Sequence, residues 1–289
     1  MNEFILGLKE AFIPAILVVV VPTTALGFLT SGLGNASLFL VSILLIILVD
    51  LSANVINNYS DWEIDIENNK RKHMHKVFSK RDMLTIYVVL LILIFVVLAL
   101  AQLNYYLLIT VLIAILLGIL YSSGPKFKDI TIINYITIAI AYAATAFAIG
   151  YFAGSSSLSG FIRWLPLMLF LMFVDFGYSI TKDYSDMLGD AAHGKKTLPV
   201  VKGKKTSIKI QLYEITFAYA FLFIAVAMNL LSIVFSLLII SYFVAIYILT
   251  KIKNTENKET YERMHYYAQR NGLLVRALII IILLILGLL

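Results

Sequence analysis

Cysteine is absent from the 289 residues of the chain, which excludes disulfide bonds and thiol chemistry. Charged residues are scarce: they make up 14% of the chain, whereas a soluble domain carries about a quarter. Because 61% of the residues are hydrophobic, the chain has too little polar surface to remain in water. The first ten residues contain a single lysine, so we expect the first apolar run to remain as a membrane span and not to be cleaved as a signal peptide.

Apolar runs of about 20 residues, the length that crosses a bilayer, recur along the whole chain. We place nine of them near residues 11–31, 38–58, 84–101, 104–121, 131–153, 164–182, 208–228, 230–250 and 271–288. The alternating ten-residue pattern of a membrane β-barrel is absent. Helices satisfy their own backbone hydrogen bonds in lipid, so each run is predicted to be a transmembrane helix.

The basic residues lie on one side of these spans. The net charge is +6, and Lys and Arg gather in the segments 70–81, 126–128, 195–205 and 251–270, whereas the alternate loops carry essentially only Arg163. This asymmetry indicates topology and not nucleic-acid binding, and it predicts a cytoplasmic N-terminus. We therefore predict one domain over residues 1–289: an all-α multi-pass protein of the cell membrane, with nine helices around a central cavity and cap loops on the cytoplasmic side.

An acidic motif follows the second span. Asn57, Asp61 and Asp65 are spaced i, i+4 and i+8, which places them on one face of a helix that continues from the span. Carboxylates aligned in this way repel each other, so we expect a cation between them. The alternative for such a motif alone is a solvated helix end with a favourable cap.

A second acidic motif follows the sixth span and makes the solvated alternative weaker. Asp183, Asp186 and Asp190 are spaced i, i+3 and i+7 and again share one helix face. Oxygen-only ligand sets suit Mg²⁺, which keeps waters and bridges to substrate phosphates. Two such faces at the same membrane surface predict a diphosphate held by magnesium between them, and an active site on the cytoplasmic side.

The order and spacing of several motifs resemble the UbiA superfamily of intramembrane prenyltransferases. These motifs are the Asn-x3-Asp-x3-Asp run at 57–65, the Asp-x3-Asp pair at 186–190, the Gly-x2-Thr-Leu-Pro run at 194–199, the Tyr-Ser-Ser-Gly-Pro-Lys-Phe-Lys run at 121–128, and Asn134. The resemblance covers nearly the whole chain, including the nine helices. It implies transfer of a polyprenyl group, such as geranylgeranyl, from its diphosphate to a lipophilic acceptor.

The resemblance also implies roles for the acidic residues. The first motif would bind one Mg²⁺ and the diphosphate, and Asp186 and Asp190 would bind a second Mg²⁺. Asp183 adds a third carboxylate, and the resulting Lys-Asp-x2-Asp-x2-Gly-Asp run resembles the branch that makes archaeal ether lipids and some tail-adding enzymes of quinone or chlorophyll synthesis. The acceptor is therefore either a prenylated glyceryl phosphate or an aromatic precursor. The oligomeric state stays open.

The basic and aromatic partners of the diphosphate are less defined. The loop after the first motif lacks the Pro-x-Arg-Pro of the family, so Arg71, Lys72 and Lys126 are the candidates for phosphate contacts, although each could serve topology alone. Tyr121 could turn its ring face to an allylic cation or could anchor the helix at the interface. The family resemblance assigns Asn134 to substrate binding.

Two acids lie inside apolar spans and leave another class of protein open. Asp50 and Asp175 would suit a secondary transporter, which places ionisable groups near the bilayer midplane. We expect instead that both hydrogen-bond between helices, with Lys182 as a partner for Asp175. The clustering of the other acids at one surface argues against a transporter, and a non-catalytic scaffold would not need two acidic faces. The run His73-x-His75 is too short and too solvated to predict a metal site.

Overall fold

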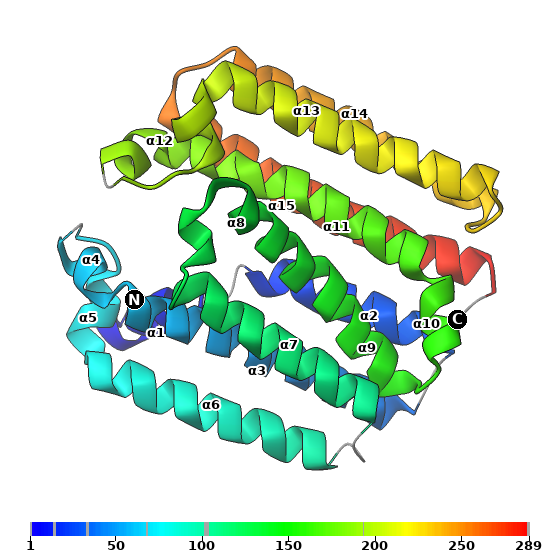
Figure 1. The fold of residues 1–289 in the computed structure, drawn as a ribbon, viewed down its shortest axis with the longest axis horizontal. Coiled ribbons are helices and arrows are strands. Elements are labelled where there is room, and N and C mark those ends of the chain that lie inside the picture. The colour runs from blue at the N-terminus through cyan, green and yellow to red at the C-terminus, as the bar shows by residue number, and fades with distance from the viewer. Residues whose placement is uncertain are drawn as a thin grey trace.

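The computed structural model describes residues 2–13, 16–32, 35–67, 69–100, 104–192 and 194–287, and these residues form helices without strands (Figure 1). The α-helices are α1 (Glu3–Phe12), α2 (Leu17–Thr30), α3 (Ala36–Ser60), α4 (Trp62–Glu67), α5 (Lys72–Val77), α6 (Lys80–Leu100), α7 (Tyr105–Ser122), α8 (Thr131–Ala139), α9 (Ala146–Gly154), α10 (Leu158–Arg163), α11 (Leu165–Ser179), α12 (Asp183–Ala192), α13 (Leu198–Ala227), α14 (Ile239–Lys253) and α15 (Lys258–Ile285). Three 3-10 segments are η2 (Phe127–Asp129), η4 (Ile180–Lys182) and η5 (Ile233–Leu238), and η3 (Ile140–Thr145) is a π-helical stretch.

The number of spans agrees with the hydropathy of the sequence. Within the described ranges, eight helical segments are long and apolar enough to cross a membrane, and a ninth results if α1 and α2, which are bent by 51°, count as one span. Three of the spans in the described residues are composite: one joins α8, η3 and α9, another joins α11, η4 and α12, and a third joins η5 and α14. Residues 14, 15, 101 and 288 of the predicted spans lie outside the described residues. The all-α multi-pass fold is confirmed.

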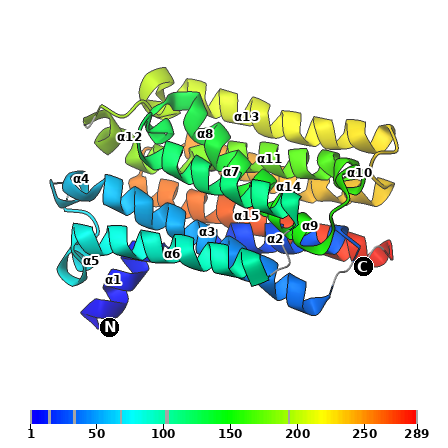
Figure 2. The same ribbon diagram turned by 60° about the horizontal axis from the view of Figure 1, so that its bottom comes forward.

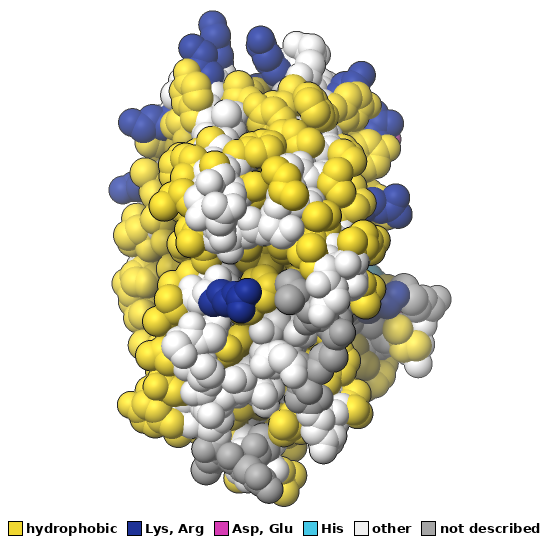
Figure 3. Space-filling model, turned by 90° about the vertical axis from the view of Figure 1, so that its right-hand side faces the viewer, with side chains coloured by type: hydrophobic (Ala, Val, Ile, Leu, Met, Phe, Trp, Pro, Cys, Tyr) yellow, Lys and Arg dark blue, Asp and Glu magenta, His cyan; other side chains and the backbone are white. Residues whose placement is uncertain are grey.

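The polar short helices gather at one end of the bundle. The long helices lie roughly side by side, and α4, α5 and α12 lie at the end that also holds the N-terminus, whereas α10 lies at the other end with the C-terminus (Figures 1 and 2). Hydrophobic side chains, other uncharged side chains and backbone cover most of the α10 end (Figure 3). The end formed by α4, α5, α12 and η2 is called the polar end below, because it carries both acidic motifs.

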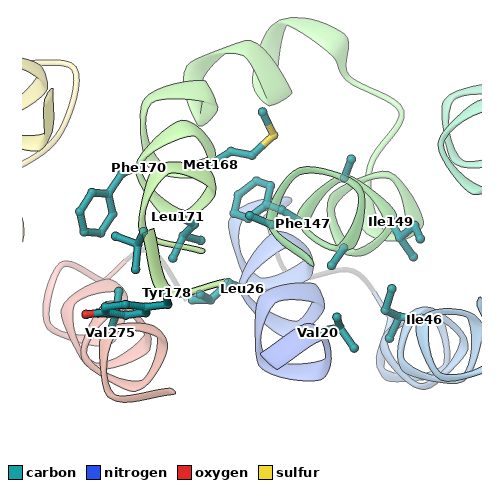
Figure 4. Packing of buried hydrophobic residues seen from close by; sticks show 14 of the residues in the cluster. Val20, Leu26, Ile46, Phe147, Ile149, Met168, Phe170, Leu171, Tyr178 and Val275 are labelled. Carbon is teal, nitrogen blue, oxygen red and sulfur yellow. The ribbon is translucent and has the colours of Figure 1, made fainter. Parts of the chain in front are cut away.

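Glycines allow α2 and α9 to pack backbone against backbone. A Cβ atom added at Gly27 would lie 1.9 Å from the carbonyl oxygen of Phe147, and one at Gly150 would lie 1.9 Å from that of Thr24. Such close approach through small residues is typical of helix pairs in membranes. The contact fixes one wall of the core, where Phe147 of α9 lies beside α2 (Figure 4).

A buried ion pair ties three helices together in the interior of the bundle. Arg276 of α15 is fully buried and donates from Nη2 to Asp175 Oδ2 of α11 at 2.6 Å and from Nε to Thr23 Oγ1 of α2 at 2.6 Å. Its Nη1 donates to the carbonyl oxygen of Gly272 at 3.0 Å. Asp175 therefore does link helices, but the expected partner Lys182 is wrong. Only tertiary structure brings Arg276, 101 residues away in sequence, to this carboxylate.

Candidate active site

The first acidic motif surrounds a lysine ammonium. Lys128 Nζ, from η2, donates to Asp61 Oδ1 and Oδ2 at 2.6 Å each and to Asn57 Oδ1 at 2.8 Å. Burial lowers the pKa of Lys128, and the charge of Asp61 offsets that effect only in part. Three oxygens from one helix end thus converge on a single cation.

The third member of the motif has a different partner. α3 ends at Ser60 and α4 starts at Trp62, yet hydrogen bonds from Asp61 N to Asn57 O and from Asp65 N to Asp61 O keep the helical register. Asp65 forms an ion pair with Arg71, the residue that precedes α5. The prediction of one acidic face is therefore correct in register, but in this structure Asp65 faces Arg71 and not Lys128.

The second motif occupies α12 at the same end. Asp183 and Asp190 are buried, whereas Asp186 is partly exposed and accepts a 3.4 Å hydrogen bond from the Ser185 hydroxyl. The hydroxyl of Tyr135 on α8 donates to Asp183 Oδ2 and accepts a hydrogen bond from Leu198 N at 2.9 Å.

Asp190 and the neighbouring polar groups complete this part of the site. Lys195 Nζ lies 3.3 Å from Asp190 Oδ1. Burial pulls the pKa of Lys195 down, but the charge and hydrogen bond of Asp190 outweigh burial and raise it. Near α12, Asn134 Oδ1 and Thr197 Oγ1 are buried without a hydrogen-bond partner among the described residues, and such groups call for a ligand or water.

A cavity of about 390 Å³ lies inside the bundle and reaches Asn57 of the first motif and Lys182, the residue before α12. Its walls come from α2, α3, α7, α8, η3, α11 and α15, and they are mostly apolar. Asn57, Arg71, Tyr121 and Lys182 contribute polar atoms to its lining. The volume is within the range of small-molecule sites, roughly 300–1,000 Å³. The predicted central cavity is confirmed.

The oxygens of the first motif are suited to a divalent cation. No group of three or more Asp, Glu or His side chains in the described part of the chain is close enough to share a metal. The carboxylate and amide oxygens around Lys128 Nζ nevertheless form an oxygen-only set that already holds a cation. That donor set suits Mg²⁺. The first motif therefore fits a magnesium site, with the lysine as a stand-in ion.

The comparison with known proteins identifies the family. The profile of the UbiA prenyltransferase family matches residues 19–286. The chain belongs to this family. Digeranylgeranylglyceryl phosphate synthase from Thermococcus sibiricus is 31% identical over 184 residues, which span 63% of this chain and 63% of that protein. The alignment thus covers less than two thirds of the length of that relative.

Solved structures show the UbiA fold over nearly the whole chain. A structure from a study of digeranylgeranylglyceryl phosphate synthase in membranes has a TM-score of 0.73 at 24% identity and covers 97% of this chain and 98% of its own. A UbiA homologue from Archaeoglobus fulgidus bound to DMAPP and Mg²⁺ has a TM-score of 0.72 at 18% identity, with 94% of this chain and 99% of its own covered. These likenesses establish the fold of this UbiA family member.

The structure discriminates among the basic candidates of this UbiA chain. Arg71 lines the cavity, whereas Lys72 is exposed. Lys126 has a left-handed backbone with φ of 47° and no ion pair among the described residues, and that turn presents Lys128 to the first motif. Sequence reasoning did not select Lys128. The Lys-Phe-Lys run at 126–128 indicated a cation near the site, but which of its two lysines contacts the first motif depends on the turn at Lys126.

Proposed function

We propose that the chain transfers a polyprenyl group from its diphosphate to a lipophilic acceptor with the help of Mg²⁺. The observation that carries this proposal is the Lys128 ammonium held by Asn57 and Asp61 at the polar end of the bundle, where Asn57 also lines the mostly apolar cavity. This arrangement offers a charged site for a diphosphate and an apolar volume for an isoprenoid chain. Each buried CH₂ contributes about 0.8 kcal/mol, so a long prenyl chain gains much from such a cavity.

The first motif would hold one Mg²⁺ through Asn57, Asp61 and Asp65, and α12 would hold the second through Asp183, Asp186 and Asp190. Bound metal neutralises the charge of the leaving diphosphate. Because Asp65 is paired with Arg71, this pair would have to separate, or Arg71 would have to bind the diphosphate together with Asp65.

Cationic donors of this chain would bind the diphosphate oxygens directly. Lys128 and Arg71 lie next to the first motif, and Arg71 also lines the cavity. Fixed positive charge where negative charge develops is the largest contribution in many such sites. The Tyr121 side chain, on the cavity wall near Asn57, is placed to meet an allylic cation with its ring. Asn134, with its unpaired buried oxygen, would bind substrate beside α12.

A prenylated glyceryl phosphate is the acceptor that we favour over an aromatic one. The curated relative from Thermococcus sibiricus is a digeranylgeranylglyceryl phosphate synthase. The cavity of this chain also carries a second cation, Lys182, on η4, the 3-10 turn that leads into α12, and Lys182 is a residue apart from those of the first motif. An acceptor phosphate needs such an additional cation, whereas a flat aromatic acceptor does not.

A secondary transporter is disfavoured by the same structure. Asp175, one of the two acids that suggested it, is neutralised by Arg276. The other acids of the two motifs lie at one end of the bundle and not near its middle (Figure 1).

The test is transfer by the purified protein. Incubation with radiolabelled geranylgeranyl diphosphate, Mg²⁺ and either geranylgeranylglyceryl phosphate or an aromatic quinone precursor should give a labelled ether lipid with the first acceptor. Product with the aromatic acceptor alone would assign the chain to the other branch. Absence of product with both acceptors, while the protein stays folded, would contradict the proposed transfer.

A further inference from the structure

Two carboxylates face the cavity from within the membrane-spanning helices. Asp50 on α3 and Asp175 on α11 both line it, and each is 7% exposed. An ionisable side chain at such a place is costly and persists where it is neutralised or where it has a function. The sequence suggested the same structural role for both, but the structure separates them.

Their partners differ in charge. Asp175 has the ion pair with Arg276. Asp50 Oδ2 accepts one hydrogen bond, at 3.1 Å, from the neutral amide of Asn54, which lies one turn along the same helix. The Asn54 amide nitrogen also lies 3.3 Å from the carbonyl oxygen of Phe12, so it is fixed from two sides. Among the described residues, Asp50 has no ion pair, and its Oδ1 atom has no hydrogen-bond donor.

We propose that Asp50 is the general base that takes the proton from the hydroxyl group of the acceptor. This inference rests on the proposed prenyl transfer. In that reaction the bond between the allylic carbon and the diphosphate oxygen breaks, and its electron pair leaves with the diphosphate. The acceptor oxygen then forms the new C–O bond, and its proton passes to the Asp50 carboxylate.

The depth of Asp50 suits this role. It precedes Asn57 by seven residues, so along α3 it lies about 10 Å below the metal-binding end. A base works within roughly 2.6–3.2 Å of the proton that it removes, and the reacting atoms of a near-attack pair are about 3–3.5 Å apart. Together, the distance from the base to the acceptor oxygen and from that oxygen to the allylic carbon is about 6 Å. The diphosphate ester would span the remaining distance to the metal-binding end.

Four other carboxylates of the site are already paired with a cation. Asp61, Asp65, Asp175 and Asp190 each form an ion pair with Lys or Arg. A carboxylate neutralised in this way is a poor proton acceptor. Asp183 and Asp186 have no ion pair among the described residues either, but they belong to the proposed metal-binding motif on α12 and do not line the cavity. Asp50 lies on the cavity wall without a cation, so its position and hydrogen bonding leave it available.

The test separates cleavage of the donor from its trapping by the acceptor. Geranylgeranyl diphosphate labelled with ¹⁸O at the bridging position reports reversible C–O cleavage through migration of the label. We expect Asp50→Asn to slow ether formation by about 100-fold, a typical contribution of a general base. Label migration, and the affinity for an inert thiolodiphosphate analogue in the presence of Mg²⁺, should stay near those of the wild type. Asp50→Glu, which restores a carboxylate, should recover part of the ether formation.

Asp175→Asn is the matched control, because it removes the other carboxylate of the same cavity. It should lower the melting temperature by leaving Arg276 unpaired, whereas Asp50→Asn should not. Near-normal ether formation in Asp50→Asn would overturn the role of Asp50 and would leave the proposed transfer intact. Loss of label migration or of analogue binding in Asp50→Asn would show a structural role and would also overturn it. If the wild type neither cleaves nor transfers, the proposed function fails and the role of Asp50 with it.

Discussion

Lys128→Met should change metal affinity and turnover in opposite directions. The ammonium of Lys128 lies 2.6 Å from both carboxylate oxygens of Asp61 and 2.8 Å from Asn57 Oδ1, the atoms assigned to a magnesium ion. In the absence of substrate, Mg²⁺ must displace this ammonium to bind. Methionine retains most of the aliphatic stem and removes the charge, so the three oxygens become available to the metal.

The magnitude follows from the contact that Mg²⁺ no longer has to break. A hydrogen bond to a charged group contributes about 1.5–3 kcal/mol, and about 1.4 kcal/mol corresponds to a tenfold change in Kd. The lower end of this range gives the smallest change that competition at one site predicts. We expect Mg²⁺ to bind Lys128→Met about tenfold more tightly without donor. Turnover should nevertheless fall by about 100-fold, the scale of losing one electrostatic contact to a reacting group.

Mg²⁺ titration followed by thermal melting or calorimetry gives the first quantity, and radiolabelled transfer at saturating Mg²⁺ gives the second. Bound metal stabilises by RT ln(1 + [Mg²⁺]/Kd), so the difference between variants appears directly in melting. Lys126→Met is the control, because Lys126 lies two residues away and forms no ion pair among the described residues. Equal Mg²⁺ affinity of Lys128→Met and the wild type would refute competition at one site, and normal turnover would refute the diphosphate contact.

Three further outcomes are expected. Chelation of divalent ions should abolish transfer, and added Mg²⁺ should restore it; full activity in excess chelator would refute the metal requirement. Cysteines introduced at Ser79 and Gly203 should react only with reagents that reach the cytoplasmic side, since both lie in basic segments, and labelling from outside would contradict the proposed orientation. Gly150→Ala should lower the melting temperature strongly because its Cβ would collide with α2, whereas Gly189→Ala, where a Cβ meets nothing within 4 Å, should fold normally; equal melting of the two would refute the close packing of α2 and α9.

Hydropathy was sufficient to predict the positions of the membrane spans, because the bilayer requires each span to be a helix of about the same length. It was insufficient for helix boundaries where a helix continues into polar sequence. Helix α15 starts at Lys258, well before the predicted start at 271. Helix α13 starts at Leu198, before the predicted start at 208, but its helical backbone is interrupted at Gly203, where φ is 73°. Lipid selects for apolar residues within its own thickness, so the polar extension of a helix leaves no trace in a hydropathy pattern.

The sequence predicts which carboxylates form the site, but it does not predict which lysine or arginine pairs with each of them. Helical spacing determines which acids share a face, and the Asp61 and Asp190 motifs do lie at the same end of the bundle (Figure 1). The partner of each acid depends instead on turns and on contacts over long sequence separations. Lys128, and not Lys126, pairs with Asp61 because the backbone at Lys126 is left-handed. Arg276 contacts Asp175 only after α15 packs against α11.

The acids of this chain differ most in what neutralises them, and this difference separates structural from chemical roles. Asp175 has a fully buried arginine that is itself held by Thr23, so removing either charge would leave the other buried in the bundle without an ionic partner. Asp61 has a lysine that a stronger cation can displace, which suits a site that must bind and release a metal with its diphosphate. Asp50 has only an amide. Among these three acids, the one with a permanent counter-ion maintains the fold, the one with an exchangeable counter-ion binds charge, and the one without a counter-ion is free to accept a proton.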